Sequence, residues 1–408
     1  MRKIDITTFL NYIFILYAFV LPLSRASVAI ASVLIVVLFA STKDIRSYTK
    51  QILSNRASLS ILLFILYYYT MLLFAPMDQL KDGVRYLLPF LYLLPATIAS
   101  VVLYRDTIYK MTIALLLGIF ISEIVSYGIY FGLWEKGKVL VIDPSPFMHH
   151  IQYSTFLAFG IIVALYRILH TYPIAHKVLY GIFLLSSIGT LFLIKGRTGQ
   201  VAFIVTLFVV AFVSFEKRIK ATLISILLSV GLLFGAYHLS DTFKERIAMA
   251  QSDIINMQEH NNYGTSLGYR VGVTILSLKS IERYPIFGTG VVDAMPSIQA
   301  QANIRFPDDY WLKRANHLQN QYLQVVVEAG LVGLSFLLYM LYQISQITII
   351  STEYRTMKIT LMSIYILTML SDIQLHVQFT IGLFAIVVGM LLAQSRVDQE
   401  SMTKGRDE

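Results

Sequence analysis

The chain has 408 residues, of which 56% are hydrophobic and only 14% charged. An ordinary soluble domain carries about 25% charged residues, so this chain lacks the polar surface of a water-soluble globule and is predicted to be an integral membrane protein. It contains no cysteine, which excludes a disulfide scaffold, a thiolate metal site and a cysteine nucleophile. The net charge of +9 would suggest nucleic acid for a soluble protein. In a membrane protein the distribution of cations across the bilayer matters more, and nucleic acid is not expected as a partner.

Apolar segments recur along the chain at the length of membrane helices, which need roughly 20 residues each. Twelve such segments predict an all-α, polytopic fold with about 12 transmembrane helices. The eleventh is short and rich in threonine, and is the weakest of the set. The segments cover residues 8–23, 26–41, 59–75, 84–103, 108–133, 151–169, 178–194, 198–215, 219–237, 331–350, 358–371 and 377–393.

Lysines and arginines in the short loops favour one orientation in the membrane. If the N-terminus is cytoplasmic, the inner loops hold far more of the 33 lysines and arginines than the short outer loops do. Both termini are therefore expected in the cytoplasm, with one large, partly helical loop facing the periplasm. The predicted organisation is helices one to nine in 1–238, the periplasmic loop in 239–330, helices ten to twelve in 331–395 and a cytoplasmic tail in 396–408.

Three polar residues in the first half of the chain are candidates without an assigned role. Glu123 lies inside the fifth apolar segment, where a carboxylate is either functional or protonated and hydrogen-bonded to a neighbouring helix. His149 and His150 precede the sixth segment and follow Asp143. Adjacent residues point to different faces of a helix, so we expect a structural or acceptor-binding role for the two histidines rather than a joint metal site.

The junction Lys195-Gly-Arg-Thr-Gly-Gln200 lies between two apolar segments at the predicted outer interface. Unpaired charge near hydrocarbon costs a few kcal/mol. An anionic lipid headgroup or a diphosphate is therefore a natural partner for Lys195 and Arg197. A tight turn whose cations reach phospholipid headgroups explains the same residues equally well.

The long loop contains two further motifs. Gly268-Tyr-Arg-Val-Gly272 opens an expected helix over residues 266–281, where Arg270 could direct a bidentate fork at phosphate oxygens, although a single loop arginine is by default a surface residue. A turn, Pro285-Ile-Phe-Gly-Thr-Gly290, follows this helix.

A polar stripe precedes the tenth apolar segment. A second loop helix is expected over residues 309–329, and at helical spacing His317, Asn320, Gln321, Gln324 and Glu328 share one of its faces. A neutral imidazole at the outer leaflet can accept a proton from a hydroxyl near neutral pH. The ordinary alternative is an interfacial helix whose histidine is merely solvated.

Taken together, Lys195–Gln200, Arg270, Pro285–Gly290 and His317–Gly333 resemble the motifs of the O-antigen ligase and O-antigen polymerase-like superfamily of bacterial membrane glycosyltransferases, most closely the O-antigen ligases. The resemblance is specific between about residues 193 and 333. It implies a GT-C-like membrane fold. It also implies transfer of a glycan from undecaprenyl diphosphate to a lipid A–core oligosaccharide at the periplasmic face of the inner membrane.

The resemblance also assigns roles residue by residue. It makes His317 the general base and places Arg197 and Arg270 on the diphosphate, with Lys195 as a helper by position. Where the family often has serine after the junction arginine, this chain has Thr198, which leaves the role of that hydroxyl open. We expect an inverting reaction without a metal or another cofactor. Supporting roles are expected for Asn316, Asn320, Gln321, Glu328 and Gln200.

Other functions stay open at this point. A repeat-unit polymerase would use the same chemistry with two lipid-linked substrates, and a protein O-oligosaccharyltransferase would attack with a protein hydroxyl. A transporter of lipid-linked sugars is less compatible, because transporters typically show internal repeats and binding sites near the bilayer midplane. Here the polar motifs lie at the outer face and in one large asymmetric loop, which argues against translocation.

Overall fold

The computed structural model describes residues 5–137, 139–170, 173–214, 217–239, 241–260 and 262–407. Within these ranges the regular structure is helical apart from one isolated bridge between Leu140 and Asp143, which confirms the all-α prediction. Residues 1–4 of the predicted cytoplasmic N-terminus, the end of the eighth apolar segment at 215 and the last residue of the predicted tail lie outside the described residues.

The helices follow one another with short connections. In chain order they are α1 (Ile6–Val20), α2 (Arg25–Ala40), α3 (Ile45–Ser54), α4 (Arg56–Thr70), η1 (Met71–Phe74), α5 (Leu80–Leu87), η2 (Leu88–Leu93), α6 (Leu94–Val102), α7 (Arg105–Tyr130), α8 (His150–His170), α9 (Ile174–Leu193), α10 (Arg197–Ser214), α11 (Arg218–Leu239), α12 (Asp241–His260), α13 (Ser266–Arg283), α14 (Ala294–Arg305), η3 (Leu312–Arg314), α15 (Gln321–Ser345), α16 (Thr352–Thr368) and α17 (Gln378–Asp407).

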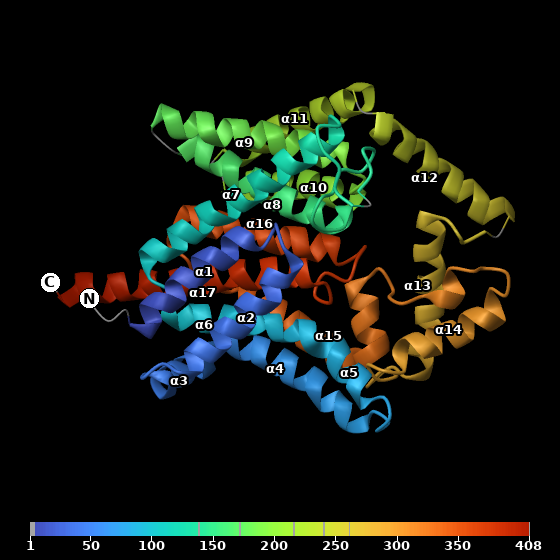
Figure 1. Cartoon of the computed structure of the whole chain (residues 1–408), viewed down its shortest axis with the longest axis horizontal. Helices are drawn as coiled ribbons and strands as arrows, with labels where there is room; N and C mark the ends of the chain where they lie inside the picture. Colours follow the sequence, from blue (N-terminus) through green and yellow to red (C-terminus); the bar gives the residue numbers. More distant parts are fainter. Residues whose placement is uncertain are drawn as a thin grey trace.

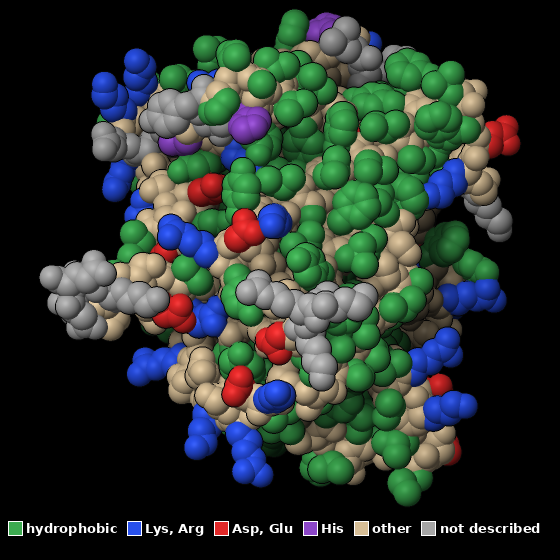
Figure 2. Space-filling view, turned by 60° about the vertical axis from the view of Figure 1, so that its left-hand side comes forward, with side chains coloured by type: hydrophobic (Ala, Val, Ile, Leu, Met, Phe, Trp, Pro, Cys, Tyr) green, Lys and Arg blue, Asp and Glu red, His purple; other side chains and the backbone are tan. Residues whose placement is uncertain are grey.

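The described chain has nine helices long and apolar enough to cross a membrane, or ten if the pair α2 and α3, bent by 115°, forms one span. Each of the twelve predicted segments overlaps a helix, but α1, α2 and α16 have only 15, 16 and 17 residues. Hydrophobic side chains cover much of the molecular face in Figure 2, with acidic and basic side chains scattered between them. The chain is therefore a polytopic all-α membrane protein, and the count of twelve spans stays a prediction.

The helices form a bundle with a separate layer at one end (Figure 1). The start of α1 and the end of α17 lie together at one end of the bundle, and α12, α13 and α14 lie at the opposite end. We call the described residues between 241 and 320 the cap. The cap has its own apolar core, which includes Val273, Leu276, Ile298 and Leu312. This core fixes the cap segment that leads into α15.

The cap differs in part from the sequence prediction. The helix expected over 266–281 is confirmed as α13, whereas α12 and α14 were not predicted. The helix expected over 309–329 is wrong in its first half, because the chain forms the short turn η3 and α15 begins only at Gln321. Gln319 has a positive φ of 47°, and the side chain of Asn320 accepts the amides of Tyr322 and Leu323 as an N-cap. His317 therefore lies in a loop and not on a helical stripe.

The end of the chain is also more ordered than expected for a solvated tail. Helix α17 continues through residues 396–407. The guanidinium of Arg396 donates to the carbonyl of Val101 at 2.7 Å, and Asp398 accepts the amide of Ile350 at 2.8 Å. The predicted tail thus extends the most enclosed helix of the bundle.

Candidate functional site

The junction motif is packed tightly by its glycines. A Cβ at Gly196 would lie 2.6 Å from the carbonyl oxygen of His150, and one at Gly199 would lie 2.3 Å from Cβ of Ser154. The first turn of α10 can therefore approach α8 only with glycine at these positions. Arg197 is consequently held at the N-terminus of α10, where it contacts Ser266 of the cap.

Asp143 ties this junction to the loop before α8. Its carboxylate binds Nδ1 of His150 at 2.7 Å and accepts the backbone amide of Lys195 at 3.1 Å. Burial disfavours the charged carboxylate, but the contacts with His150 and Lys195 outweigh it, and the pKa of Asp143 is lowered. The expectation that His149 and His150 diverge is wrong, because their ring centroids lie 3.9 Å apart. Both residues lie where α8 begins, so ideal helical spacing does not apply.

Arg197 and Arg270 converge on one serine. Nη2 of Arg197 donates to Oγ of Ser266 at 3.4 Å, and Nη1 of Arg270 donates to the same oxygen at 3.1 Å. Arg197 belongs to the bundle helix α10 and Arg270 to the cap helix α13. Residues 73 positions apart are thus brought to one point, and the binding of an anion there stays a prediction.

Arg270 lies in a partly buried setting beside a second positive charge. Burial and then the neighbouring charge of Arg197 lower the pKa of Arg270, against the opposing influence of Asp372 and Asp253. Nε of Arg270 is buried and has no hydrogen-bond partner in the described part of the chain. A partly buried guanidinium with an unused donor favours an anionic ligand with several oxygens, such as a phosphate group.

His317 is fixed through its backbone and one ring nitrogen. The Tyr269 hydroxyl donates to the carbonyl of His317 at 3.0 Å, and the amide of Gln319 donates to Nδ1 of His317 at 3.3 Å. Burial lowers the pKa of His317, and the charges of His376 and Arg270 act in the same direction, whereas Asp372 opposes them. The imidazole is therefore neutral at pH 7, and its Nδ1 lone pair accepts a long hydrogen bond from the Gln319 amide.

Asp372 is a site residue that sequence reasoning missed. It lies in the loop between α16 and α17, with 7% of its surface exposed. Burial raises its pKa, while the charges of His317, Arg270 and His150 act to lower it. The sequence signal that could have revealed Asp372 is its position as a carboxylate in the short polar run between the last two apolar segments.

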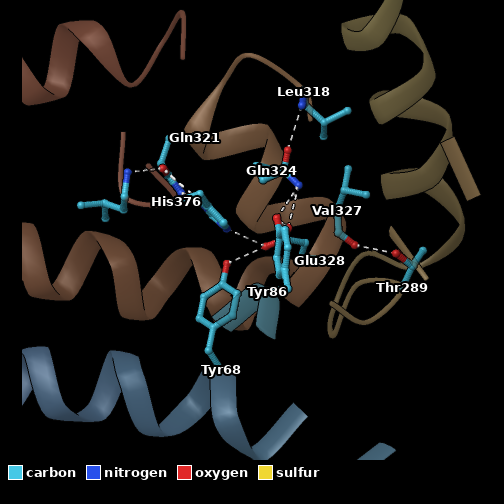
Figure 3. A network of polar contacts seen from close by, with 10 residues as sticks. Tyr68, Tyr86, Thr289, Leu318, Gln321, Gln324, Val327, Glu328 and His376 are labelled. Carbon is cyan, nitrogen blue, oxygen red and sulfur yellow. Dashed lines mark hydrogen bonds and ion pairs between the residues drawn. The ribbon is translucent and has the colours of Figure 1, made fainter. Parts of the chain in front are cut away.

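A buried polar network centres on Glu328 of α15 (Figure 3). Its side chain is 0% exposed and accepts the Tyr68 hydroxyl at 3.2 Å and the Gln324 amide at 2.6 Å. Tyr86 donates to the same carboxylate, and Nε2 of His376 lies 3.3 Å from it. The carboxylate is therefore satisfied by groups from α4, α5, α15 and the loop before α17, as a buried charge requires.

This network also holds the two loops of the site (Figure 3). Oε1 of Gln324 accepts the amide of Leu318 at 2.8 Å, and Oε1 of Gln321 accepts the amide of Leu375 at 2.9 Å. The Asn320 side chain donates to the carbonyl of Leu370 at 3.1 Å. The loop of His317 and the loop of Asp372 are thus fixed to the same helix, although His317 itself does not share the stripe of Gln321, Gln324 and Glu328.

The Pro285–Gly290 turn lies against a break in α15. Gly330 has a φ of 65° inside this helix, which interrupts its backbone hydrogen bonds. The turn supplies replacements, because Gly290 donates to the carbonyl of Glu328 at 3.0 Å and Pro285 accepts the amide of Leu331 at 2.9 Å. The glycines of this motif therefore serve the contact between cap and bundle.

Gly330→Ala is expected to destabilise the folded protein. Alanine at positive φ costs about 1–2 kcal/mol, and its Cβ would lie 2.0 Å from the carbonyl oxygen of Ile286. A clearly lower melting temperature of the purified variant is expected, with Gly181→Ala, which meets nothing within 4 Å, as the matched control. Equal melting of both variants would contradict this account of the break.

A cavity of about 400 Å³ opens beside His317 on the cap side. Ser266, Asn316, His317 and Gln319 line it together with Tyr310 and Trp311. Because Ser266 also accepts hydrogen bonds from both arginines, the cavity adjoins the point where the two guanidinium groups meet. Asn316 lines the cavity beside His317, and the supporting role of Asn316 stays a prediction.

Three residues that the sequence suggested as candidates do not line this cavity. Gln200 is buried and donates to the carbonyl of Leu191 at 2.9 Å, a structural contact. Lys195 contributes its backbone amide to Asp143. Glu123 accepts the Ser187 hydroxyl of α9 at 2.5 Å, which matches the hydrogen-bonded alternative for an intramembrane carboxylate.

Comparisons with known proteins agree with these motifs. Residues 181–338 match the family model described as O-antigen ligase. The chain is also 28% identical over 209 residues to an uncharacterized protein of Haemophilus influenzae, an alignment that covers 49% of this chain and 51% of the relative. The chain thus spans about half the length of that curated relative. The matched family segment contains Arg197, Arg270 and His317, and over this segment the chain is similar to the O-antigen ligases.

Proposed function

We propose that this protein is a membrane glycosyltransferase of the O-antigen ligase type. It transfers a glycan from undecaprenyl diphosphate to a hydroxyl of a lipid A–core acceptor at the periplasmic face of the bacterial inner membrane. The observation that carries this proposal is the convergence of Arg197 and Arg270 on Ser266, in the wall of the cavity that contains His317. The cap lies opposite both chain ends (Figure 1), which supports cytoplasmic termini and a periplasmic cap.

The two guanidinium groups bind the diphosphate of the donor. As the bond between the anomeric carbon and the phosphate oxygen breaks, negative charge grows on the diphosphate. Fixed cations aimed at that charge stabilise the transition state without reorganisation. The unused Nε of Arg270 supplies one further donor. Lys195 adds positive charge nearby, and a diphosphate needs no general acid to depart.

His317 takes the proton of the attacking hydroxyl. The acceptor hydroxyl replaces the Gln319 amide at Nδ1, a replacement favoured by the length of that hydrogen bond, 3.3 Å. The acceptor oxygen bonds to the anomeric carbon, its proton moves to the imidazole, and the diphosphate leaves from the opposite side. The product is inverted at the anomeric carbon. The nearby Asp372 stabilises the imidazolium that forms.

Reconstitution tests this function. The purified protein in lipid vesicles is incubated with undecaprenyl diphosphate glycan and with lipid A–core. We expect release of undecaprenyl diphosphate and a glycan-bearing lipid A–core, unchanged by a chelator. Transfer to a second lipid-linked glycan would instead assign a polymerase, and absence of turnover with any acceptor would refute the glycosyltransferase.

The pH dependence of transfer is expected to reflect His317 and Asp372. Because the pKa of His317 is lowered from 6.5, the neutral base persists at pH 7, and activity falls only as the pH drops below 6.5. Asp372→Asn removes a charge that favours the imidazolium. It should lower kcat and move the acidic limb of the kcat/KM profile to still lower pH. A limb that moves upward would contradict this role.

A further inference from the structure

Two large aromatic side chains are exposed on the cap next to the site. Tyr310 is 52% exposed and Trp311 is 60% exposed, and both line the cavity that contains His317. Trp311 is one of only two tryptophans in the chain. Exposed aromatic surface in the wall of a cavity indicates ligand contact, because apolar groups otherwise favour burial.

The turn that carries this pair is held by hydrogen bonds and by the cap core. Oδ1 of Asp309 accepts the amide of Leu312 at 2.8 Å, and Leu312 is fully buried in the cap core. The amide of Arg314 donates to the carbonyl of Trp311 at 3.1 Å. The guanidinium of Arg314 lies 4.2 Å from the ring centroid of Tyr310. The aromatic pair is therefore preorganised, which lowers the entropic cost of binding a ligand.

Polar groups face the same cavity. Oε1 of Gln319 is buried without a hydrogen-bond partner in the described residues, although Gln319 lines the cavity. Such an unused acceptor is costly unless a ligand donates to it. Asn316 is exposed and adds an amide side chain to the same wall. Aromatic faces combined with amide side chains suit a sugar ring, which has apolar C–H faces and hydroxyl edges.

We propose that this cavity is a saccharide subsite that holds the sugar bonded to the donor diphosphate. The ring stacks on Trp311 and Tyr310, and one of its hydroxyls donates to Oε1 of Gln319. The assignment to the donor follows from Ser266, which lines the cavity and receives both arginines. The subsite rests on the proposed function and adds the residues that recognise the transferred glycan.

Fluorescence of Trp311 tests the subsite directly. Trp134→Phe leaves Trp311 as the sole tryptophan, and Trp134 lies outside the cavity, where it donates to the carbonyl of Val125. The variant in lipid nanodiscs is titrated with undecaprenyl diphosphate glycan and, separately, with undecaprenyl diphosphate. A change in emission with the glycan-bearing donor alone is expected. Equal responses to both lipids would overturn the subsite. So would quenching by brominated phospholipids, which would make Trp311 a bilayer anchor.

Kinetics supply an independent test. Trp311→Ala should raise the KM for the donor by about tenfold, the loss expected for one stacking contact, and leave inhibition by glycan-free undecaprenyl diphosphate unchanged. Trp311→Phe should keep most of the affinity, and Trp134→Phe should behave as the parent protein. If the parent transfers glycan and Trp311→Ala has the parental KM, the subsite is refuted while the proposed function stands. If the parent protein itself transfers none, the proposed function fails.

Discussion

Replacing His317 by alanine is expected to lower glycan transfer by about 10²–10⁴-fold, the usual contribution of a general base. The imidazole is the neutral group with a lone pair beside the arginine pair, and its lowered pKa keeps it unprotonated at pH 7. Initial rates of the reconstituted protein measure the effect. In cells the lipid-linked donor should accumulate.

The matched control is His176→Ala, which removes an exposed histidine of α9. This variant should transfer at the parental rate. Parental activity of a correctly folded His317→Ala protein would remove the imidazole from the mechanism. Inactivity at all pH values, together with unchanged binding of undecaprenyl diphosphate, would support the base and separate it from donor binding.

Replacing Arg270 by alanine is expected to lower kcat by about 10²–10³-fold, the range for loss of one preorganised donor to developing negative charge. Inhibition by undecaprenyl diphosphate should weaken in parallel, because the product carries the same anion. Arg270→Lys should recover only part of both effects, since a lysine keeps the charge but loses the planar fork of donors.

Arg283→Ala provides the control for this second result. Arg283 lies in the last turn of the same helix, and its guanidinium stacks on Tyr284 at 5.4 Å. It should leave product inhibition unchanged. Full recovery by Arg270→Lys would indicate a simple point-charge effect, and unchanged inhibition in Arg270→Ala would place the diphosphate elsewhere.

The sequence predicted the bundle better than the cap, for a physical reason. Membrane helices must bury every backbone polar group and present apolar side chains to lipid, which leaves long hydrophobic runs in the sequence. Helices α12 and α14 have mixed polarity, and α14 packs on a small core, so no such run reveals them. The start of α15 depends on one left-handed residue, Gln319, and on the cap at Asn320, although an asparagine at a helix start is itself a recognisable signal.

The site was predictable where its residues belong to compact motifs. Arg197, Arg270 and His317 each stand in a recognisable stretch of the family segment. Asp372 and the tyrosines around Glu328 do not, because they meet the motifs only through tertiary contacts. Tyr68 lies 260 residues before the carboxylate that it binds. From the sequence alone, a tyrosine in an apolar segment is expected to face lipid or to lie in the hydrophobic core, because its hydrogen-bond partner is not known.

The division of the two arginines between bundle and cap has a consequence for motion. Arg197 moves with α10 and Arg270 moves with α13, and their like charges repel across Ser266. A pyrophosphate held by both guanidinium groups would reduce this repulsion and join the two layers. Binding of the substrate that we propose would therefore restrain the cap relative to the bundle, and release of the product would remove that restraint.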